Sequence, residues 1–186
     1  ISTHALNIFG DHSDVMACRQ TGFAMMCETN PQEVMDLAPV AHLAAIEGKV
    51  PFLNFFDGFR TSHEIQKVAV WDYADLKEMC NMDAVAAFRK HALNPEHPAM
   101  RGSHENGDIF FQHREACNKF YNELPAVVEK YMGKVNEKLG TNYQLFNYYG
   151  APDADRIIIA MGSICDVAEE VIDYMNAHGE KVGIVK

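Results

Sequence analysis

Short apolar runs separated by polar turns dominate the first third of the chain. They occupy residues 5–9, 23–27 and 50–56, and the stretch 14–20 has the spacing of a short helix. Apolar runs of about four to eight residues, bounded by glycine or polar turns, are typical of buried strands. We therefore expect three strands, with a short helical connection after the first.

The polar residues before position 34 mark the start of a longer helix over residues 31–47. Asn30 is a good N-cap, and Glu33 lies where a capping box places an acid. Apolar side chains then recur at helical spacing; Pro39 is expected to kink or break the helix, and Gly48 to end it in the left-handed conformation. A strand, a helix and a second strand in this order build parallel sheets. We predict an α/β fold with a parallel sheet flanked by helices.

The middle of the chain changes to helical periodicity. Residues 72–93 and 113–139 carry helical stripes, and Pro125 is expected to divide the second of them. Residues 94–107 are rich in Pro, His, Asn and Gly and show no periodicity, which predicts a long surface loop.

A change of composition near residue 140 predicts a domain boundary. Residues 140–155 mix Asn, Tyr, Gly and Pro, as linkers do. The elements expected after it are a strand at 156–161, a helix at 165–178 and a strand at 182–185. We therefore divide the chain into residues 1–143 and 144–186, the latter starting a second α/β domain. Because Ile1 is not an initiator methionine and the last residues look like part of a strand, we expect the chain to be a piece of a longer protein.

Composition narrows the possible functions. The chain has 186 residues, 48% of them hydrophobic, and a formal net charge of -10. This charge repels nucleic-acid phosphates and anionic lipids, so neither is an expected partner. The apolar runs are far shorter than the ~20 residues that cross a bilayer, and no signal-peptide pattern opens the sequence.

The cysteines are widely spaced and odd in number, and none forms a Cys-x-x-Cys pair. They are Cys18, Cys27, Cys80, Cys117 and Cys165. Such spacing argues against a disulfide scaffold, a zinc site or an iron–sulfur cluster within the chain. We expect reduced thiols in a cytoplasmic protein, and the histidines show no metal-ligand spacing either.

Polar residues follow two of the expected strands, where open parallel sheets bind ligands. After the first strand, Asp11 and His12 suit an acid–base or charge-positioning pair. The alternative is that Asp11 or Ser13 caps the next helix and His12 makes a buried hydrogen bond.

Residues 55–64 form the second candidate, a polar turn among three phenylalanines. Such a turn suits a polar group held beside an apolar wall. The alternative is a turn pair between Asp57 and Arg60, followed by a helix capped by Thr61 or Ser62. A third, weaker candidate is the Gly162-Ser163 step before a helix, where free backbone N–H groups suit a phosphate.

Several motifs follow one another in a fixed order over nearly the whole chain. They are residues 4–6, 8–15, 19–25, 51–52, 55–64, 101–102, 114–116 and 150–154 with Arg156. In combination they resemble the single-chain pyruvate:ferredoxin (flavodoxin) oxidoreductases. The resemblance implies the later part of a thiamine-diphosphate-binding domain on the pyrimidine side of the cofactor, followed by the start of a domain resembling the transketolase C-terminal domain.

The resemblance also implies a function. The family forms large homodimers that decarboxylate pyruvate on thiamine diphosphate with Mg²⁺, transfer the acetyl group to coenzyme A, and pass electrons through [4Fe-4S] clusters to ferredoxin or flavodoxin. The residues that activate the cofactor, hold its diphosphate and bind the clusters would lie outside this chain, so the chain alone is expected to bind no cofactor and to be inactive. Leu6 and Ile8 are the expected substrate-binding residues, with Asp11 and His12 beside them.

Two other functions stay open on the sequence. One is a non-catalytic scaffold or dimerisation module, in which the loop at 94–107 and the long helix hold neighbouring domains. The other is a stand-alone nucleotide- or flavin-binding domain, against which the lack of a glycine-rich phosphate loop argues. Whether Leu6, Ile8 and Asp11 line one cleft or are buried separates the enzyme from the scaffold.

Overall fold

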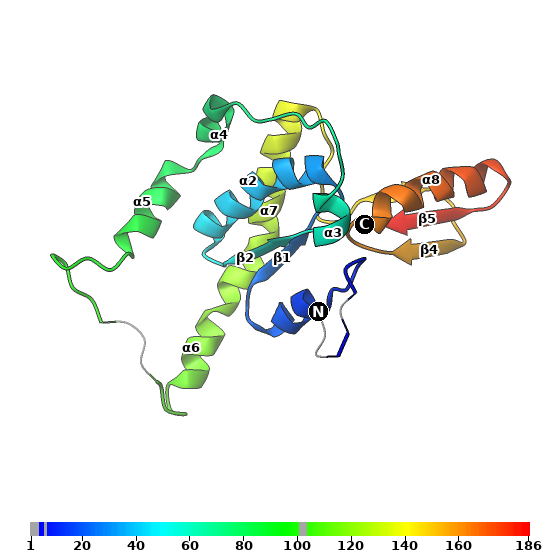
Figure 1. Cartoon of the computed structure of the whole chain (residues 1–186). Coiled ribbons are helices and arrows are strands. Elements are labelled where there is room, and N and C mark those ends of the chain that lie inside the picture. Colours follow the sequence, from blue (N-terminus) through cyan, green and yellow to red (C-terminus); the bar gives the residue numbers. More distant parts are fainter. Residues whose placement is uncertain (1–3, 6, 101–103) are drawn as a thin grey trace.

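The computed structural model describes residues 4, 5, 7–100 and 104–186. It is a mixed α/β structure with two groups of strands and helices, and a projecting helical arm between them in sequence (Figure 1). The first group contains the predicted parallel strands, and the second contains the strand–helix–strand unit expected after residue 155. The prediction of an α/β class is confirmed at this level.

The first group is built on a parallel pair of strands. β1 (Ala24–Cys27) pairs with β2 (Phe52–Phe55), Ala24 lying opposite Phe52 and Cys27 opposite Phe55. α2 (Pro31–Gly48) connects them. The expected strand–helix–strand unit is thus confirmed.

The first expected strand, at residues 5–9, is not formed among its described positions. The Asn7 side chain accepts a hydrogen bond of 2.9 Å from the backbone N–H of Phe9, so local bonding replaces a strand ladder there. Leu6 lies outside the described residues. The short helix that follows, α1 (Ser13–Ala17), and a 3₁₀ turn at Cys18–Gln20 agree with the predicted connection.

α2 begins as predicted but does not break at Pro39. The Asn30 side chain accepts from the N–H of Glu33, and the Glu33 carboxylate accepts from the N–H of Thr29. A proline removes the hydrogen bond to the carbonyl four residues earlier. Here the indole N–H of Trp71 donates to that carbonyl, on Met35, at 3.1 Å. The orphaned acceptor therefore has a partner, and the helix continues.

The left-handed residue that ends α2 is Lys49, with φ 58°, and not Gly48 as the sequence suggested. Gly48 is instead the last helical residue, where α2 crosses the long helix α7 (Asn118–Leu139). A Cβ at Gly48 would lie 2.6 Å from Cδ1 of Leu124 on α7. Close packing between the helices explains this glycine.

We expect the Lys49→Gly variant to be more stable by about 1 kcal/mol, because glycine adopts the left-handed conformation without the strain that a Cβ causes. Urea unfolding of the two chains measures this difference. A Lys49→Gly chain less stable than the parent would show that the lysine side chain contributes more than the strain costs.

The described middle part of the chain contains four further helices before α7. They are α3 (Gly58–Ser62), α4 (Tyr73–Met79), α5 (Met82–Lys90) and α6 (Phe110–Ala116). α7 runs unbroken past Pro125, contrary to prediction, and the division from α6 falls at Cys117. Pro125 is on the exposed side of α7, where water can serve the carbonyl that the proline leaves without a partner.

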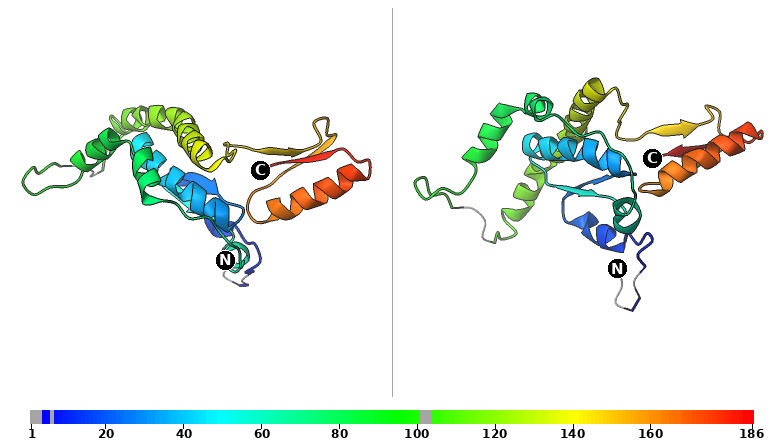
Figure 2. Two further views of the ribbon diagram at one scale, coloured as in Figure 1. Left: turned by 90° about the horizontal axis from the view of Figure 1, so that it is seen from above. Right: turned by 45° about the horizontal axis from the view of Figure 1, so that its top comes forward.

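α2 and α7 pack together and form the main core with β1 and β2. Its buried side chains are Met26, Leu37, Val40, Ala41, Leu43, Ala44, Val50, Met79, Leu124, Val128, Tyr131, Met132 and Val135. α5 and the loop after it project away from this core (Figures 1 and 2). The described part of the segment 94–107 contains no helix, in agreement with the predicted loop.

The second group is a three-stranded sheet with one helix. Its strands lie in the order β3 (Tyr148–Gly150), β5 (Val182–Val185), β4 (Arg156–Ile159), and α8 (Ile164–Ala177) covers one face (Figure 2). β4 and β5 are parallel, as the strand–helix–strand pattern predicts. β3, antiparallel to β5, was not predicted, because only a linker was expected there. In the described part of the chain, no helix is long and apolar enough to cross a membrane.

Candidate substrate pocket

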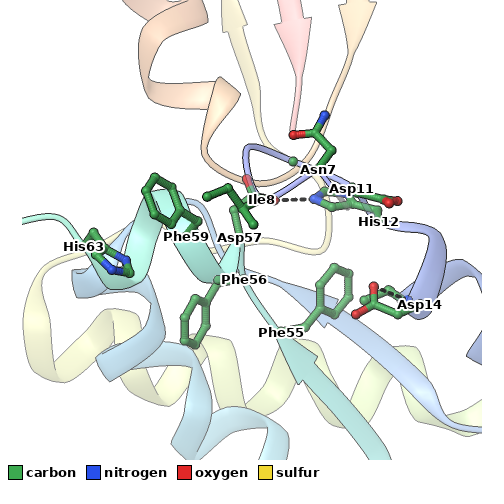
Figure 3. A pocket seen from close by; sticks show the side chains of 13 residues that line it. Asn7, Ile8, Asp11, His12, Asp14, Phe55, Phe56, Asp57, Phe59 and His63 are labelled. Atoms are coloured by element: carbon green, nitrogen blue, oxygen red, sulfur yellow. Dashed lines mark hydrogen bonds and ion pairs between the residues drawn. The ribbon is translucent and has the colours of Figure 1, made fainter. Parts of the chain in front are cut away.

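A pocket of about 340 Å³ lies between the N-terminal segment and the end of β2 (Figure 3). Its lining contains Ile8, Asp11 and His12, three of the four residues expected to bind substrate; the fourth, Leu6, lies outside the described residues. Asp57, directly after β2, also lines it. The structure thus brings together the polar residues that follow the N-terminal segment and β2.

One side of the pocket is apolar. Phe55, Phe56 and Phe59 line it, and Phe9 packs edge-on against Phe59 with ring centroids 4.8 Å apart. Ile8 faces the same space and is 45% exposed. An isoleucine this exposed is not a core residue, which favours a cleft over burial.

The polar side of the pocket is a side-chain hydrogen bond between His12 and Asp57. Nε2 of His12 contacts Oδ1 of Asp57, and the side chains are 28% and 8% exposed. Burial opposes ionisation of Asp57, but hydrogen bonds from His12 and Ser163 outweigh it, so the pKa of Asp57 is lowered. Asp57 is therefore an anion at neutral pH. It holds one nitrogen of His12 and leaves Nδ1 for a ligand or water.

The other carboxylate oxygen of Asp57 reaches the second group of elements. Oδ2 accepts a hydrogen bond of 2.7 Å from the backbone N–H of Ser163, at the N-terminus of α8. In the sequence analysis this helix end was a candidate phosphate-binding site. In the structure, the carboxylate of Asp57 lies there instead. The positive end of a helix dipole favours either anion.

The alternative structural interpretations of both motifs are partly right. Asp11 accepts a hydrogen bond of 2.9 Å from the N–H of Ser13, as a local turn or cap would. The predicted turn pair between Asp57 and Arg60 is wrong, because α3 begins at Gly58 and the Arg60 guanidinium lies 5.3 Å from the centre of the Phe9 ring. Thr61, expected as a cap, is buried and donates to the carbonyl of Thr29 at 3.4 Å.

Sequence reasoning missed the acid at the end of β1. Glu28 is fully buried, and neither carboxylate oxygen has a hydrogen-bond partner of good geometry among the described residues; the same holds for Oδ1 of Asn54 on β2. Burial raises the pKa of Glu28 to about 8, a rise that its interaction with Asn54 only partly opposes. The signal in the sequence that could have indicated this residue is the position of an acid directly after an apolar strand.

Within residues 4, 5, 7–100 and 104–186, no three His, Cys, Asp or Glu side chains gather in a way that would hold a metal ion. An iron–sulfur cluster needs four such ligands, so the described residues do not fit one by themselves. The pocket offers an apolar wall on one side and a histidine beside aspartates on the other.

Comparison with known proteins identifies the class. The family described as pyruvate flavodoxin/ferredoxin oxidoreductase, thiamine diphosphate-binding, matches residues 1–133. The chain belongs to this family, as its motifs suggested.

Individual relatives match over the whole chain. It is 60% identical over 185 residues to a pyruvate-flavodoxin oxidoreductase of Enterobacter agglomerans and 56% identical over 186 residues to a pyruvate:ferredoxin oxidoreductase of Moorella thermoacetica. A protein of Cryptosporidium parvum named pyruvate dehydrogenase [NADP(+)] is 48% identical over 187 residues. All of this chain is covered in each case, but only 16% of the length of the first two relatives and 10% of the third.

Proposed function

We propose that this chain is part of an enzyme that oxidatively decarboxylates pyruvate to acetyl-CoA and CO₂, and that its pocket binds the pyruvate. The supporting observation is identity of 48–60% over all of the chain to relatives whose names differ in the electron acceptor but share pyruvate. We therefore expect the choice of electron acceptor, ferredoxin or flavodoxin, to depend on other parts of the protein. To this chain we assign a part in binding pyruvate.

The pocket suits pyruvate chemically. Ile8 and the phenylalanines offer an apolar wall for the methyl group. An anionic substrate would be repelled by Asp57, but that carboxylate is already paired with His12 and hydrogen-bonded by Ser163. Nδ1 of His12 is then the ring nitrogen left for the substrate, with Asp11 at the rim; it accepts a hydrogen bond in the neutral imidazole and donates to a substrate oxygen only in the imidazolium form. When bound, thiamine diphosphate supplies the carbanion chemistry that cleaves the carboxylate from pyruvate.

The remaining cofactors belong, in this proposal, to the whole protein. Mg²⁺, [4Fe-4S] clusters and coenzyme A would be held by residues outside this chain, in a cytoplasmic homodimer; the five cysteines of the chain are free. Residues 1–143 would form part of the domain on the pyrimidine side of thiamine diphosphate. Residues 144–186 would begin a domain resembling the transketolase C-terminal domain.

The test is an assay of the full-length protein that contains this chain. With pyruvate, coenzyme A and an added ferredoxin or flavodoxin, the carrier should be reduced and one CO₂ released for every two electrons transferred. Carrier reduction with other 2-oxo acids but not with pyruvate would overturn the substrate assignment. A protein that releases CO₂ without reducing any carrier would overturn the oxidative reaction.

Alone, the 186-residue chain should neither bind thiamine diphosphate tightly nor decarboxylate pyruvate. The described residues bring no three carboxylate, histidine or cysteine side chains together that would hold Mg²⁺ by themselves, and binding energy from the diphosphate end of the cofactor is needed for affinity. Calorimetric titration of the chain with thiamine diphosphate and Mg²⁺ measures this. Micromolar binding would contradict the prediction.

One observation favours a second role for the projecting arm, the scaffold function that the sequence left open. Along α5, α6 and the loop between them, the large side chains of Phe88, Leu93, Met100, Phe110 and Phe111 are all more than half exposed. A row of apolar side chains on a projecting segment is typical of a surface that packs against other protein. Loss of dimers in the full-length protein after charged substitutions at Phe88 and Phe111 would support this role; an unchanged dimer would exclude it.

A further inference from the structure

The side chain of Asp57 lies at the junction of three parts of the chain. It follows β2, its Oδ1 contacts His12 of the N-terminal segment, and its Oδ2 accepts from Ser163 of α8. Asp57 is also at the N-cap position of α3, where an aspartate usually accepts from its own helix, but it makes no such bond. Both oxygens are used instead for contacts far away in the sequence.

The approach of α8 to this carboxylate is unusually close. Gly162 has φ 80°, and a Cβ there would lie 2.8 Å from Oδ2 of Asp57. Glycine is therefore needed both for the backbone conformation and for the space that the carboxylate fills. The hydroxyl of Ser163 also acts on Asp57, together with its backbone N–H. Both residues of the Gly162-Ser163 step are thus adapted to the carboxylate of Asp57: Gly162 leaves space for it, and Ser163 donates hydrogen bonds to it.

We propose that Asp57 is a positioning residue that couples the seating of α8 to the orientation of His12 in the pocket. A carboxylate held at Oδ2 by α8 has its Oδ1 fixed in place, and Oδ1 in turn fixes the imidazole ring through Nε2. Where α8 moves away, Asp57 loses that support and His12 loses a defined orientation. The second group of elements thereby controls the polar side of the pocket, although none of its residues lines it.

This proposal rests on the proposed function for its consequence, because an ordered His12 matters for turnover only where the pocket binds pyruvate. The coupling itself is a mechanical property that can be measured without substrate. The experiment therefore has two readouts, one for the coupling and one for the pocket.

The variants act on α8 and leave Asp57 and His12 in place. Ser163→Pro removes both the N–H and the hydroxyl, and its ring carbon displaces Oδ2 of Asp57 from the place where the N–H met it. The φ of Ser163 is −62°, within the range of proline. Ser163→Ala removes the hydroxyl alone. The matched control is Asp166→Ala, which deletes a different contact of α8 with the first group, the hydrogen bond of 3.0 Å from Asn30 to Asp166.

Hydrogen exchange of the full-length protein measures the coupling in peptides over α1, whose Met16 N–H donates to the carbonyl of His12. We expect exchange there to rise about tenfold in Ser163→Pro, the factor for a lost hydrogen bond to a charged group, and less in Ser163→Ala. The exchange rates of peptides in α2 and α7 should stay unchanged in all variants. The exchange rate of α1 should stay unchanged in Asp166→Ala. Unchanged α1 exchange in Ser163→Pro, or an equal rise in Asp166→Ala, would overturn the coupling through Asp57.

Steady-state kinetics gives the second readout. When Asp57 couples α8 to His12 as proposed, Ser163→Pro should raise KM for pyruvate more than it lowers kcat, since the variant disorders a binding group and not the cofactor. Faster exchange at α1 with unchanged pyruvate kinetics would leave the coupling standing and remove His12 from the substrate site. The failure of one proposal is thus distinct from the failure of the other.

Discussion

Replacing Glu28 with glutamine should stabilise the folded chain by about 3 kcal/mol at pH 8. The wild-type carboxyl is fully buried without a hydrogen-bond partner of good geometry among the described residues, and its pKa is raised from 4.5 to about 8. A rise of that size corresponds to up to about 4–5 kcal/mol of unfavourable burial of the charged form. Glutamine has no charge, but its amide also needs partners, so part of the gain is lost.

The pH dependence has a defined sign. In the unfolded chain the carboxyl loses its proton near pH 4.5, while in the folded chain it keeps it until about pH 8. Between these values the folded state binds more protons than the unfolded state. The free energy of unfolding of the wild type should therefore fall from about pH 5 to pH 8 and then level off. In Glu28→Gln this decline should be absent, so the two chains differ little at pH 4.5 and most at pH 8.

Urea unfolding at several pH values measures both chains. The matched control is Glu129→Gln, which makes the same chemical change at an exposed position of α7 and should keep the wild-type profile. Parallel profiles for Glu28→Gln and the wild type would show that Glu28 does not titrate in this range.

Local patterns in the sequence predicted most of the elements, and the errors have specific physical causes. The Asn30 cap, the parallel pair of strands and the last strand–helix–strand unit depend on nearby residues, and they were predicted. Of the kink or break expected at Pro39, the break does not occur, because Trp71, 32 positions later, donates to the freed carbonyl. The left-handed end of α2 was misplaced because Gly48 serves the contact with Leu124 instead.

At the candidate site, too, features set by nearby residues were predicted and contacts between distant residues were not. Asp11 and His12 were singled out because they follow an apolar run, and Ile8 because of the family resemblance. All three line the pocket, even though no strand forms there among the described residues. The partner of His12 was not predicted. Asp57 is 45 positions away and Ser163 a further 106, and no local pattern indicates which side chain a carboxylate will meet across two groups of elements.

The largest expected effect on activity is that of Ile8→Ala in the full-length protein, where kcat/KM for pyruvate should fall about 10- to 200-fold. This is the range expected when an apolar contact with a methyl-sized group is lost in the transition state. The expectation rests on the proposed role of the pocket, in which Ile8 and the phenylalanines surround the methyl group. Because Ile8 is 45% exposed in the chain, its truncation should leave no buried cavity and change the melting temperature little.

The matched control for this variant is Ile109→Ala. Ile109 is 47% exposed, but it lies next to α6 on the projecting arm and does not line the pocket. The two variants remove the same atoms from equally exposed side chains, so any difference in pyruvate kinetics comes from position alone. Equal kinetics in the two variants would remove Ile8 from the substrate site. A marked fall in melting temperature for Ile8→Ala alone, with normal kinetics, would show that Ile8 packs against neighbouring protein and has a structural role.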